Sequence, residues 1–315
     1  MRYISDLQEG DRISSVYLCK QKTGALTRNG KPYDNVLLQD KSGTIDGKIW
    51  DPNSQGIADF EAMDFIEVTG DVTSFSGTLQ MNIRRVRIAR PDEYRPEDYM
   101  PSSQRSSGEM LQELLAYVGS VKNPHLAALL KRFFTEDKEF FKSFTERSAA
   151  KTVHHAFVGG LMEHTLSVTR FCEYLSSAYP LIRRDLLVTA ALLHDIGKTQ
   201  ELNPFPLNDY SEEGQLIGHI VIGAQMIHDQ VRSLPGFPHV LENELVHCIL
   251  AHHGELEYGS PKKPALMEAL ALHLADNADA RLQTMTELFD ADKANKTWIG
   301  FNRQFDSNLR RTEEV

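Results

Sequence analysis

The first ninety residues alternate short apolar and β-branched runs with turn residues, a pattern that predicts β-strands. The runs cover residues 13–20, 33–39, 44–50, 65–72 and 79–88. Residues 40–43, Asp-Lys-Ser-Gly, have the composition of a tight turn between the second and third runs. Within this region we expect a helix at residues 53–63 alone. The first part of the chain is therefore predicted to be a small β-domain with one helical insertion.

The order of these segments predicts a closed barrel. Five strands with a helix after the third match the oligonucleotide-binding (OB) barrel. In the last run the apolar positions change phase, from Leu79, Met81 and Ile83 to Val86 and Ile88. A slip of one residue predicts a β-bulge, which a closing barrel often needs.

From residue 108 to residue 290 the apolar positions recur with helical spacing, which predicts an all-α bundle. The longer helices are expected at residues 156–178, 184–196, 214–231, 240–253 and 265–289. Residues 91–107 contain three prolines and a Ser-rich run, and we interpret them as a linker. The predicted fold class is a multidomain β + α chain, with an OB barrel over residues 1–90, a helical bundle over 108–290 and a polar tail over 291–315.

Charge is distributed unevenly between these parts. The chain has 315 residues, with 34 Lys and Arg against 44 Asp and Glu, so its formal net charge is −10. Residues 1–90 contain 12 basic and 12 acidic side chains, so the whole excess lies in residues 91–315. This balance argues against a protein held on nucleic acid by a bulk positive field. A local basic groove or a bound metal is still compatible with a nucleic-acid substrate.

The three cysteines and the apolar segments indicate the compartment. Cys19, Cys172 and Cys248 are far apart and form no CxxC pair, so we expect reduced thiols. The first residues lack the apolar region of a signal peptide, and no apolar stretch is long enough to span a bilayer. We therefore expect a cytoplasmic protein without a membrane partner.

An adjacent His-Asp pair, His194 and Asp195, closes an apolar run and is followed by Ile-Gly-Lys. Burying imidazole and carboxylate in such surroundings costs several kcal/mol unless they pair or bind a cation. Other candidate ligands lie on, or at the end of, different predicted helices: His164, His219, His252, His253 and Asp276. Because a helical bundle brings such positions together in its core, this set predicts a metal centre.

The ligand types indicate which cations and which chemistry to expect. Imidazole with carboxylate favours Mn²⁺, Fe²⁺, Ni²⁺, Co²⁺ or Zn²⁺ over Ca²⁺ and Mg²⁺. We assign one ion to His164, His194, Asp195 and Asp276. A second ion would take His219, His252 and His253, with Asp195 bridging, although the choice between His252 and His253 stays open. Two such ions favour phosphoester hydrolysis. Asp195, His194 and Lys198 are the expected catalytic residues, with Lys198 offsetting phosphate charge.

These residues resemble the HD phosphohydrolase superfamily, whose pattern is H…HD…D on an all-α domain. More narrowly, three segments resemble the YhaM-type 3′–5′ exoribonucleases: HHAFVGGLMEHT at 154–165, HDIGK at 194–198 and HHGELEYGSPK at 252–262. That family also places an OB domain before the HD domain. The resemblance implies an exonuclease, with Mn²⁺ as the favoured ion, that shortens single-stranded RNA from the 3′ end and releases 5′-mononucleotides. Some members also act on or bind single-stranded DNA.

Candidate substrate contacts lie in both domains. OB barrels bind single strands by stacking bases on aromatic rings and running the backbone along basic side chains. In the barrel the candidates are Lys20, Lys22, Arg28, Lys31, Tyr33, Phe75, Arg85 and Arg87. Tyr17 and Trp50 are further aromatic candidates that a core position would explain equally well. In the helical domain the candidates are His154, His155, Lys198 and Lys262.

Two alternative functions stay open. One is an HD phosphohydrolase of small nucleotides or cyclic dinucleotides, with the OB domain serving in assembly. For cyclic-di-GMP a Gly-Tyr-Pro signature would follow the paired histidines, whereas this chain has Tyr258-Gly259-Ser260-Pro261. The other is a non-catalytic single-strand-binding protein, against which the complete ligand set argues. The preference for RNA or DNA and the presence of a homo-oligomer are not decided by the sequence.

Overall fold

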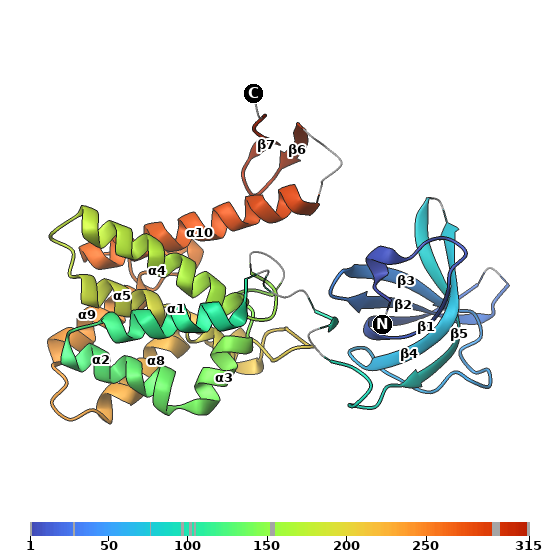
Figure 1. The fold of residues 1–315 in the computed structure, drawn as a ribbon, viewed down its shortest axis with the longest axis horizontal. Coiled ribbons are helices and arrows are strands. Elements are labelled where there is room, and N and C mark those ends of the chain that lie inside the picture. The colour runs from blue at the N-terminus through green and yellow to red at the C-terminus, as the bar shows by residue number, and fades with distance from the viewer. Residues whose placement is uncertain are drawn as a thin grey trace. The chain divides into compact units, whose positions relative to one another are not determined.

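The computed structural model describes residues 2–27, 29–75, 77–95, 98–100, 103, 105–151, 155–291 and 297–313. The chain divides into two compact units (Figure 1). The first comprises Met1–Ser102 together with Pro204–Asn208, and the second comprises Ser103–Asn203 with Asp209–Val315. The first unit is a β-barrel and the second is built mainly from helices.

The first unit is a closed five-stranded barrel, as predicted. Its strands are β1 (Arg12–Leu26), β2 (Pro32–Asp40), β3 (Gly43–Ile49), β4 (Phe65–Phe75) and β5 (Thr78–Ile88), and a short 3₁₀ helix, η1 (Ile4–Asp6), precedes them. The strand order around the barrel is β1-β2-β3-β5-β4, with β3 and β5 parallel and the other pairs antiparallel. This is the order of an OB barrel, so the predicted fold is confirmed.

The predicted bulge lies in β5. Thr69 of β4 pairs with Arg85, but the next residue, Gly70, pairs with Ile83, so Arg84 is the extra residue. Both Ile83 and Val86 remain buried on either side of it. The bulge therefore keeps the apolar positions facing the core although their phase changes along the sequence.

The helix expected at residues 53–63 is not formed, and this prediction is wrong. The segment runs as turns beside β5, with Ala58 N–H donating to Val86 O and Val86 N–H donating to Gly56 O, both at 2.9 Å. Phe60 is buried in the barrel core. Hydrogen bonds to the neighbouring strand thus replace those of a helix, and Phe60 closes the core in an irregular conformation.

The second unit is a bundle whose helices begin with α1 (Ser107–Ser120), α2 (Pro124–Lys131), the π-helix η3 (Arg132–Glu136) and α3 (Lys138–Glu146). The central helices are α4 (Gly160–Ala178) and α5 (Arg184–Leu193). They are followed by α6 (Lys198–Glu201), α7 (Glu212–Leu216), α8 (His219–Arg232), α9 (His239–Leu250), the 3₁₀ helix η4 (Leu256–Tyr258) and α10 (Met267–Ala291). No helix in the described ranges is long and apolar enough to cross a membrane.

The helix predicted at residues 214–231 is two helices. Helix α7 ends at Leu216 and α8 begins at His219, with Gly218 between them at φ 80°. A left-handed conformation of this kind favours glycine and interrupts a helix. The other long helices were predicted to within a few residues, although α4 begins at Gly160 rather than at 156.

Helix α5 is the centre of the second unit. All residues from Leu186 to Leu193 are buried, and α5 packs against α2, α4, α9 and α10 (Figure 1). A helix that is apolar on every side belongs in the interior of a bundle. Its carboxyl end therefore delivers the next two residues, His194 and Asp195, into the interior.

The tail forms a hairpin of β6 (Trp298–Asn302) and β7 (Ser307–Arg310). Cation–π contacts connect its region to α10: the Arg281 guanidinium lies 5.6 Å from the Phe305 ring, and that of Arg311 lies 5.0 Å from the Phe289 ring. The described part of the tail, residues 297–313, thus contacts the last helix.

Candidate active site

The ends of several helices bring the predicted metal ligands together. Helix α4 supplies His164, the turn after α5 supplies His194 and Asp195, and α10 supplies Asp276. The first residue of α8 is His219, and the turn after α9 contains His252 and His253. Gly197 permits this approach, because a Cβ there would overlap the His219 carbonyl oxygen. Residues separated along the chain therefore meet in one buried centre.

The first group of donor atoms surrounds His164. Its Nε2 lies 3.1 Å from Asp276 Oδ1, 3.2 Å from His194 Nε2 and 3.4 Å from Asp195 Oδ2. His194 Nε2 is also 3.4 Å from Asp195 Oδ2. The donor atoms of His164, His194 and Asp276 all lie within 4.8 Å of one another, so a single cation could contact all three.

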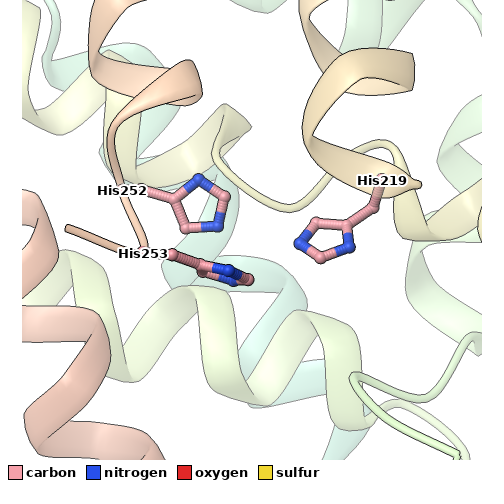
Figure 2. Close-up of side chains that lie close together, drawn as sticks. All are labelled: His219, His252 and His253. Carbon is pink, nitrogen blue, oxygen red and sulfur yellow. The ribbon is translucent and has the colours of Figure 1, made fainter. Parts of the chain in front are cut away.

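The second group contains His219, His252 and His253. Figure 2 shows the three rings converging, two from the turn after α9 and one from the start of α8. Their donor atoms again lie within 4.8 Å of one another. Asp195 Oδ1 is 3.5 Å from His219 Nε2 and 3.7 Å from His252 Nε2. The two oxygens of Asp195 thus face the two groups, which is the position of a bridging carboxylate.

The tautomers of the five histidines leave Nε2 facing inward. Each Nδ1 has an oxygen as its partner. For His164, His194, His219, His252 and His253 in turn, these partners are Asp279 Oδ2 (2.8 Å), Ala191 O (2.7 Å), Glu201 Oε1 (2.9 Å), Ile249 O (2.7 Å) and Tyr258 O (2.8 Å). Carbonyl and carboxylate oxygens accept, so Nδ1 carries the proton. The Nε2 lone pairs are then available as ligands.

Several inward-facing atoms have no hydrogen-bond partner among the described residues. They are Asp195 Oδ1, His219 Nε2 and His252 Nε2, each buried. A buried polar atom without a hydrogen-bond partner destabilises the fold by about 1–3 kcal/mol. Three such atoms together are therefore strongly destabilising unless a bound ligand interacts with them. Imidazole nitrogens with carboxylate oxygens suit first-row divalent cations. The residues present therefore fit a divalent metal centre.

The acidic members of the centre are ionised. Burial opposes ionisation of Asp195, but Lys198 and His194 outweigh it and hold its pKa well below the usual range. Burial likewise opposes ionisation of Asp276, and the hydrogen bond from His164 again lowers the pKa below the usual range. Both groups therefore carry the negative charge that a cation requires.

The histidines of the centre differ in their proton affinity. Burial, followed by the charge of His253, lowers the pKa of His252 well below its usual value, so its Nε2 is free. For His164 burial acts in the same direction, but hydrogen bonds to Asp195, Asp276 and Asp279 raise the pKa well above its usual value. A proton and a divalent cation would thus compete for the Nε2 of His164.

Lys198 is paired within the centre. Its Nζ lies 2.7 Å from Asp195 Oδ2, and its side chain is 12% exposed. Burial lowers the pKa of Lys198, but Asp195 more than reverses this and raises it. The ammonium is therefore a fixed positive charge beside Asp195, between the two donor groups.

The other predicted contacts in this unit are placed differently. His155 is buried, with Nε2 3.1 Å from Asp279 Oδ2 and its backbone N–H donating to Glu287 Oε1 at 3.1 Å. Lys262 is exposed on the loop after η4. His154 lies outside the described residues.

Two acidic residues at the centre were missed by the sequence reasoning. Glu201 is the partner of His219, and Asp279 is shared by His155 and His164. Each follows a recognised residue by three positions, Lys198 and Asp276 respectively. This spacing places both on the same helix face, and it is the signal that could have found them.

In the barrel, three aromatic side chains gather at one place. The Tyr33 and Trp50 rings stack with centroids 5.2 Å apart, and Trp50 Nε1–H donates to Asn82 Oδ1 at 3.1 Å. Trp50 is 52% exposed and Phe75 is 69% exposed. Both line a cavity of about 420 Å³ together with Asp46, Lys48, Thr78, Leu79 and Gln80. Trp50 is thus a surface residue, whereas Tyr17 is fully buried in the core.

The predicted basic contacts of the barrel differ in their surroundings. Lys22 Nζ donates to Phe60 O at 2.8 Å, and Arg87 is paired with Glu67 and Glu93 at 2.6 and 2.7 Å. Arg85 lines a second cavity of about 510 Å³, formed mainly by β4, β5 and the segment around Gly56. Lys20 and Lys31 are exposed, and Arg28 lies outside the described residues.

Comparison with known proteins now places the chain in a class and then in a family. A family model described as the HD domain matches residues 161–281, which include every predicted metal ligand. Curated relatives named 3′–5′ exoribonuclease YhaM come from Bacillus licheniformis (32% identical), Bacillus velezensis (32%) and Bacillus pumilus (33%). The alignments cover 90%, 90% and 88% of this chain and 90%, 90% and 87% of those proteins. The chain belongs to the YhaM family of 3′–5′ exoribonucleases and is a hydrolase.

A solved structure is also similar to part of this chain. It is the second OB-fold domain of replication protein A from Methanococcus maripaludis, 19% identical, with a TM-score of 0.23. The match covers 28% of this chain and 94% of that one. The assignment of the OB barrel itself rests on the strand order described above.

Proposed function

We propose that this protein is a metal-dependent 3′–5′ exoribonuclease that hydrolyses single-stranded RNA to 5′-mononucleotides. The observation that carries the proposal is the pair of donor groups that face the two oxygens of Asp195. Membership in the YhaM family supports the direction and the substrate class. Single-stranded DNA is a second substrate with the same backbone chemistry.

The residues of this chain have distinct roles in the proposed site. His164, His194 and Asp276 would hold one cation, His219, His252 and His253 would hold the other, and Asp195 would serve both. When bound, a pair of divalent cations activates a water molecule and stabilises the attacking and leaving oxygens of an in-line displacement. Lys198 keeps a positive charge next to Asp195, where it offsets charge on the phosphate.

The choice of cation follows from the donors. Seven donor residues around two positions, five imidazoles and two carboxylates, favour Mn²⁺, with Fe²⁺, Co²⁺, Ni²⁺ and Zn²⁺ as alternatives, over Mg²⁺ or Ca²⁺. Two ions rather than one are proposed because the donor atoms form two separate groups on either side of Asp195, with the atoms of each group within 4.8 Å of one another.

The barrel is proposed to hold the RNA strand. Trp50 is fixed on one face by Tyr33 and at its edge by Asn82, so its ring is a rigid stacking surface next to Phe75. Bases of any sequence stack on such rings.

We further propose an OB domain over residues 1–90, a linker over 91–107, an HD domain over 108–290 and a tail over 291–315. We propose that the protein is cytoplasmic.

The proposal is tested with a 5′-labelled single-stranded RNA incubated with the protein and Mn²⁺. We expect a ladder that shortens from the 3′ end and that EDTA abolishes. Asp276→Asn should abolish it as well, whereas Asp290→Asn, an exposed position near the end of the same helix, should not.

Two other outcomes would contradict the proposal. Turnover of mononucleotide or cyclic-dinucleotide phosphoesters with intact RNA would indicate a small-nucleotide phosphohydrolase. Tight RNA binding without turnover under any divalent cation would indicate a single-strand-binding protein.

A further inference from the structure

The histidine rings of the candidate centre differ in the group that accepts the hydrogen bond from Nδ1. Those of His194, His252 and His253 donate Nδ1–H to backbone carbonyl oxygens. Those of His164 and His219 donate to carboxylates instead. Each group of donors therefore contains one carboxylate-backed histidine, and the two carboxylates come from different helices.

Asp279 supports His164 from α10. Its Oδ2 accepts from His164 Nδ1 at 2.8 Å and from His155 Nε2 at 3.1 Å, and the residue is 8% exposed. His155 is itself held, because its backbone N–H donates to Glu287 Oε1. Asp279 is thus fixed from two sides, and it accepts from two imidazoles rather than facing an open position.

Glu201 supports His219 from α6. The same Oε1 accepts the Nδ1–H of His219 at 2.9 Å and its backbone N–H at 3.0 Å, and the residue is 8% exposed. The carboxylate therefore caps the first turn of α8 and orients the imidazole at once. Since α6 begins at Lys198, three residues after Asp195, Glu201 couples the start of α8 to the HDIGK segment.

We propose that Asp279 and Glu201 are positioning residues, each selective for one of the two cations. Asp279 sets the affinity of the ion at His164, and Glu201 sets that of the ion at His219. A carboxylate acceptor holds the ring in the ligating tautomer and makes the opposite nitrogen a stronger donor than a carbonyl does. The proposal rests on the metal centre proposed above, and it adds residues that bind neither metal nor RNA.

The test measures Mn²⁺ binding without RNA, by calorimetry and by the electron paramagnetic resonance of free Mn²⁺. Two backgrounds each keep one group of donors: His253→Ala retains the His164 group, and Asp276→Ala retains the His219 group. Asp279→Asn is expected to weaken Mn²⁺ about 10–100-fold in the first background and less than about 2-fold in the second. Glu201→Gln is expected to show the reverse selectivity.

A matched control is available on the surface. Glu242 accepts from His228 at 2.7 Å and lies 3.5 Å from His239, so Glu242→Gln changes the same type of pair on α9, away from the donor groups. It should leave Mn²⁺ affinity unchanged in both backgrounds. His155→Phe keeps Asp279 and removes its second hydrogen-bond donor, so a smaller loss confined to the His164 group is expected.

The possible outcomes distinguish a failure of this proposal from a failure of the proposed function. Absence of Mn²⁺ binding in the unsubstituted protein would contradict the metal centre. Normal binding that Asp279→Asn and Glu201→Gln leave unchanged, or weaken equally in both backgrounds, would overturn the selective roles alone. If either amide variant fails to fold, Asp279→Glu and Glu201→Asp retain the charge while moving it, and they must show the same selectivity in a weaker form.

Discussion

The barrel and the helical unit place their candidate functional residues in opposite ways. In the barrel the aromatic candidates Trp50 and Phe75 are exposed, and two of the basic candidates already have partners: Arg87 pairs with Glu67 and Glu93, and Lys22 donates to the Phe60 carbonyl oxygen. In the helical unit the seven predicted ligands are drawn from five helices or their ends into one interior centre. A β-barrel turns its polar side chains outward, whereas a bundle can turn them inward only when a partner or a cation compensates their burial. Buried polar groups therefore mark the proposed reactive site, and exposed aromatic rings mark the surface proposed to hold RNA.

The largest effect is expected from Asp195, because it alone faces both donor groups. Asp195→Ala should reduce RNA shortening by about 10³-fold or more, since it removes contacts to both ions and the partner of Lys198. His253→Ala, which leaves one group complete, should retain more activity. Initial rates with Mn²⁺ on the same labelled RNA give the measurement. Equal losses in the two variants would mean that Asp195 does not bridge.

Core substitutions test whether the two units are stabilised separately. Leu192→Ala in α5 and Leu38→Ala in β2 each remove a fully buried side chain. Each should cost about 2–5 kcal/mol of unfolding free energy. Hydrogen exchange followed by mass spectrometry should show faster exchange in the helical unit for the first variant and in the barrel for the second. Loss of protection in both units from either variant would refute separate stabilisation.

Substituting each of the two tryptophans separately compares the contribution of the barrel to RNA binding with that of the tail. Trp50 is 52% exposed and Trp298 is 57% exposed. Trp50→Ala should weaken binding of a single-stranded RNA by about 1–3 kcal/mol, the usual contribution of one stacked base. Trp298→Ala, equally exposed but outside the barrel, is the control and should change it little. Fluorescence anisotropy with EDTA present measures binding without cleavage, and reversed effects would assign the RNA contact to the tail.

The smallest effect is expected from acid on the metal-free protein. His164 and His155 lower the pKa of Asp279, and His164 lowers that of Asp276, in each case against the effect of burial. A carboxyl with a depressed pKa stabilises the fold above its unfolded pKa near 4, and this contribution is lost as the pH falls further. His164 does not offset the loss, because its raised pKa leaves it protonated in both states at acid pH.

The helical unit should therefore lose about 1 kcal/mol or more between pH 5 and pH 3, or about 2–4 °C in Tm per kcal/mol. In the barrel unit the described carboxyl with a lowered pKa is Glu93, which lies at the surface in ion pairs with Arg87 and Arg90 that solvent and salt screen, so a smaller change is expected there. Scanning calorimetry combined with hydrogen exchange assigns the transitions. A barrel that unfolds first in acid would contradict the comparison.

Much of the fold could be read from the chain because it depends on local periodicity. The alternating runs located all five strands, and the phase change between Ile83 and Val86 located the bulge at Arg84. The failures have a common cause. Residues 53–63 lost their expected helix to hydrogen bonds with β5, and residues 214–231 were divided by the left-handed Gly218. The first failure is caused by hydrogen bonds to a strand that is distant in sequence, and the second by one backbone angle. The spacing of apolar residues predicts neither.

The sequence by itself determined the positions of the five strands, the helical periods and the inventory of seven candidate ligands, because these depend on side-chain type and spacing. Only the tertiary structure decided how those ligands divide into two groups, that Asp279 supports His164 across 115 residues, and that Glu201 orients His219. It also decided that Trp50 is exposed while Tyr17 is buried. Spacing along a chain specifies which face of its own helix or strand a residue occupies. Which other face it meets depends on packing of the whole unit, and that is where the chemistry of this centre is decided.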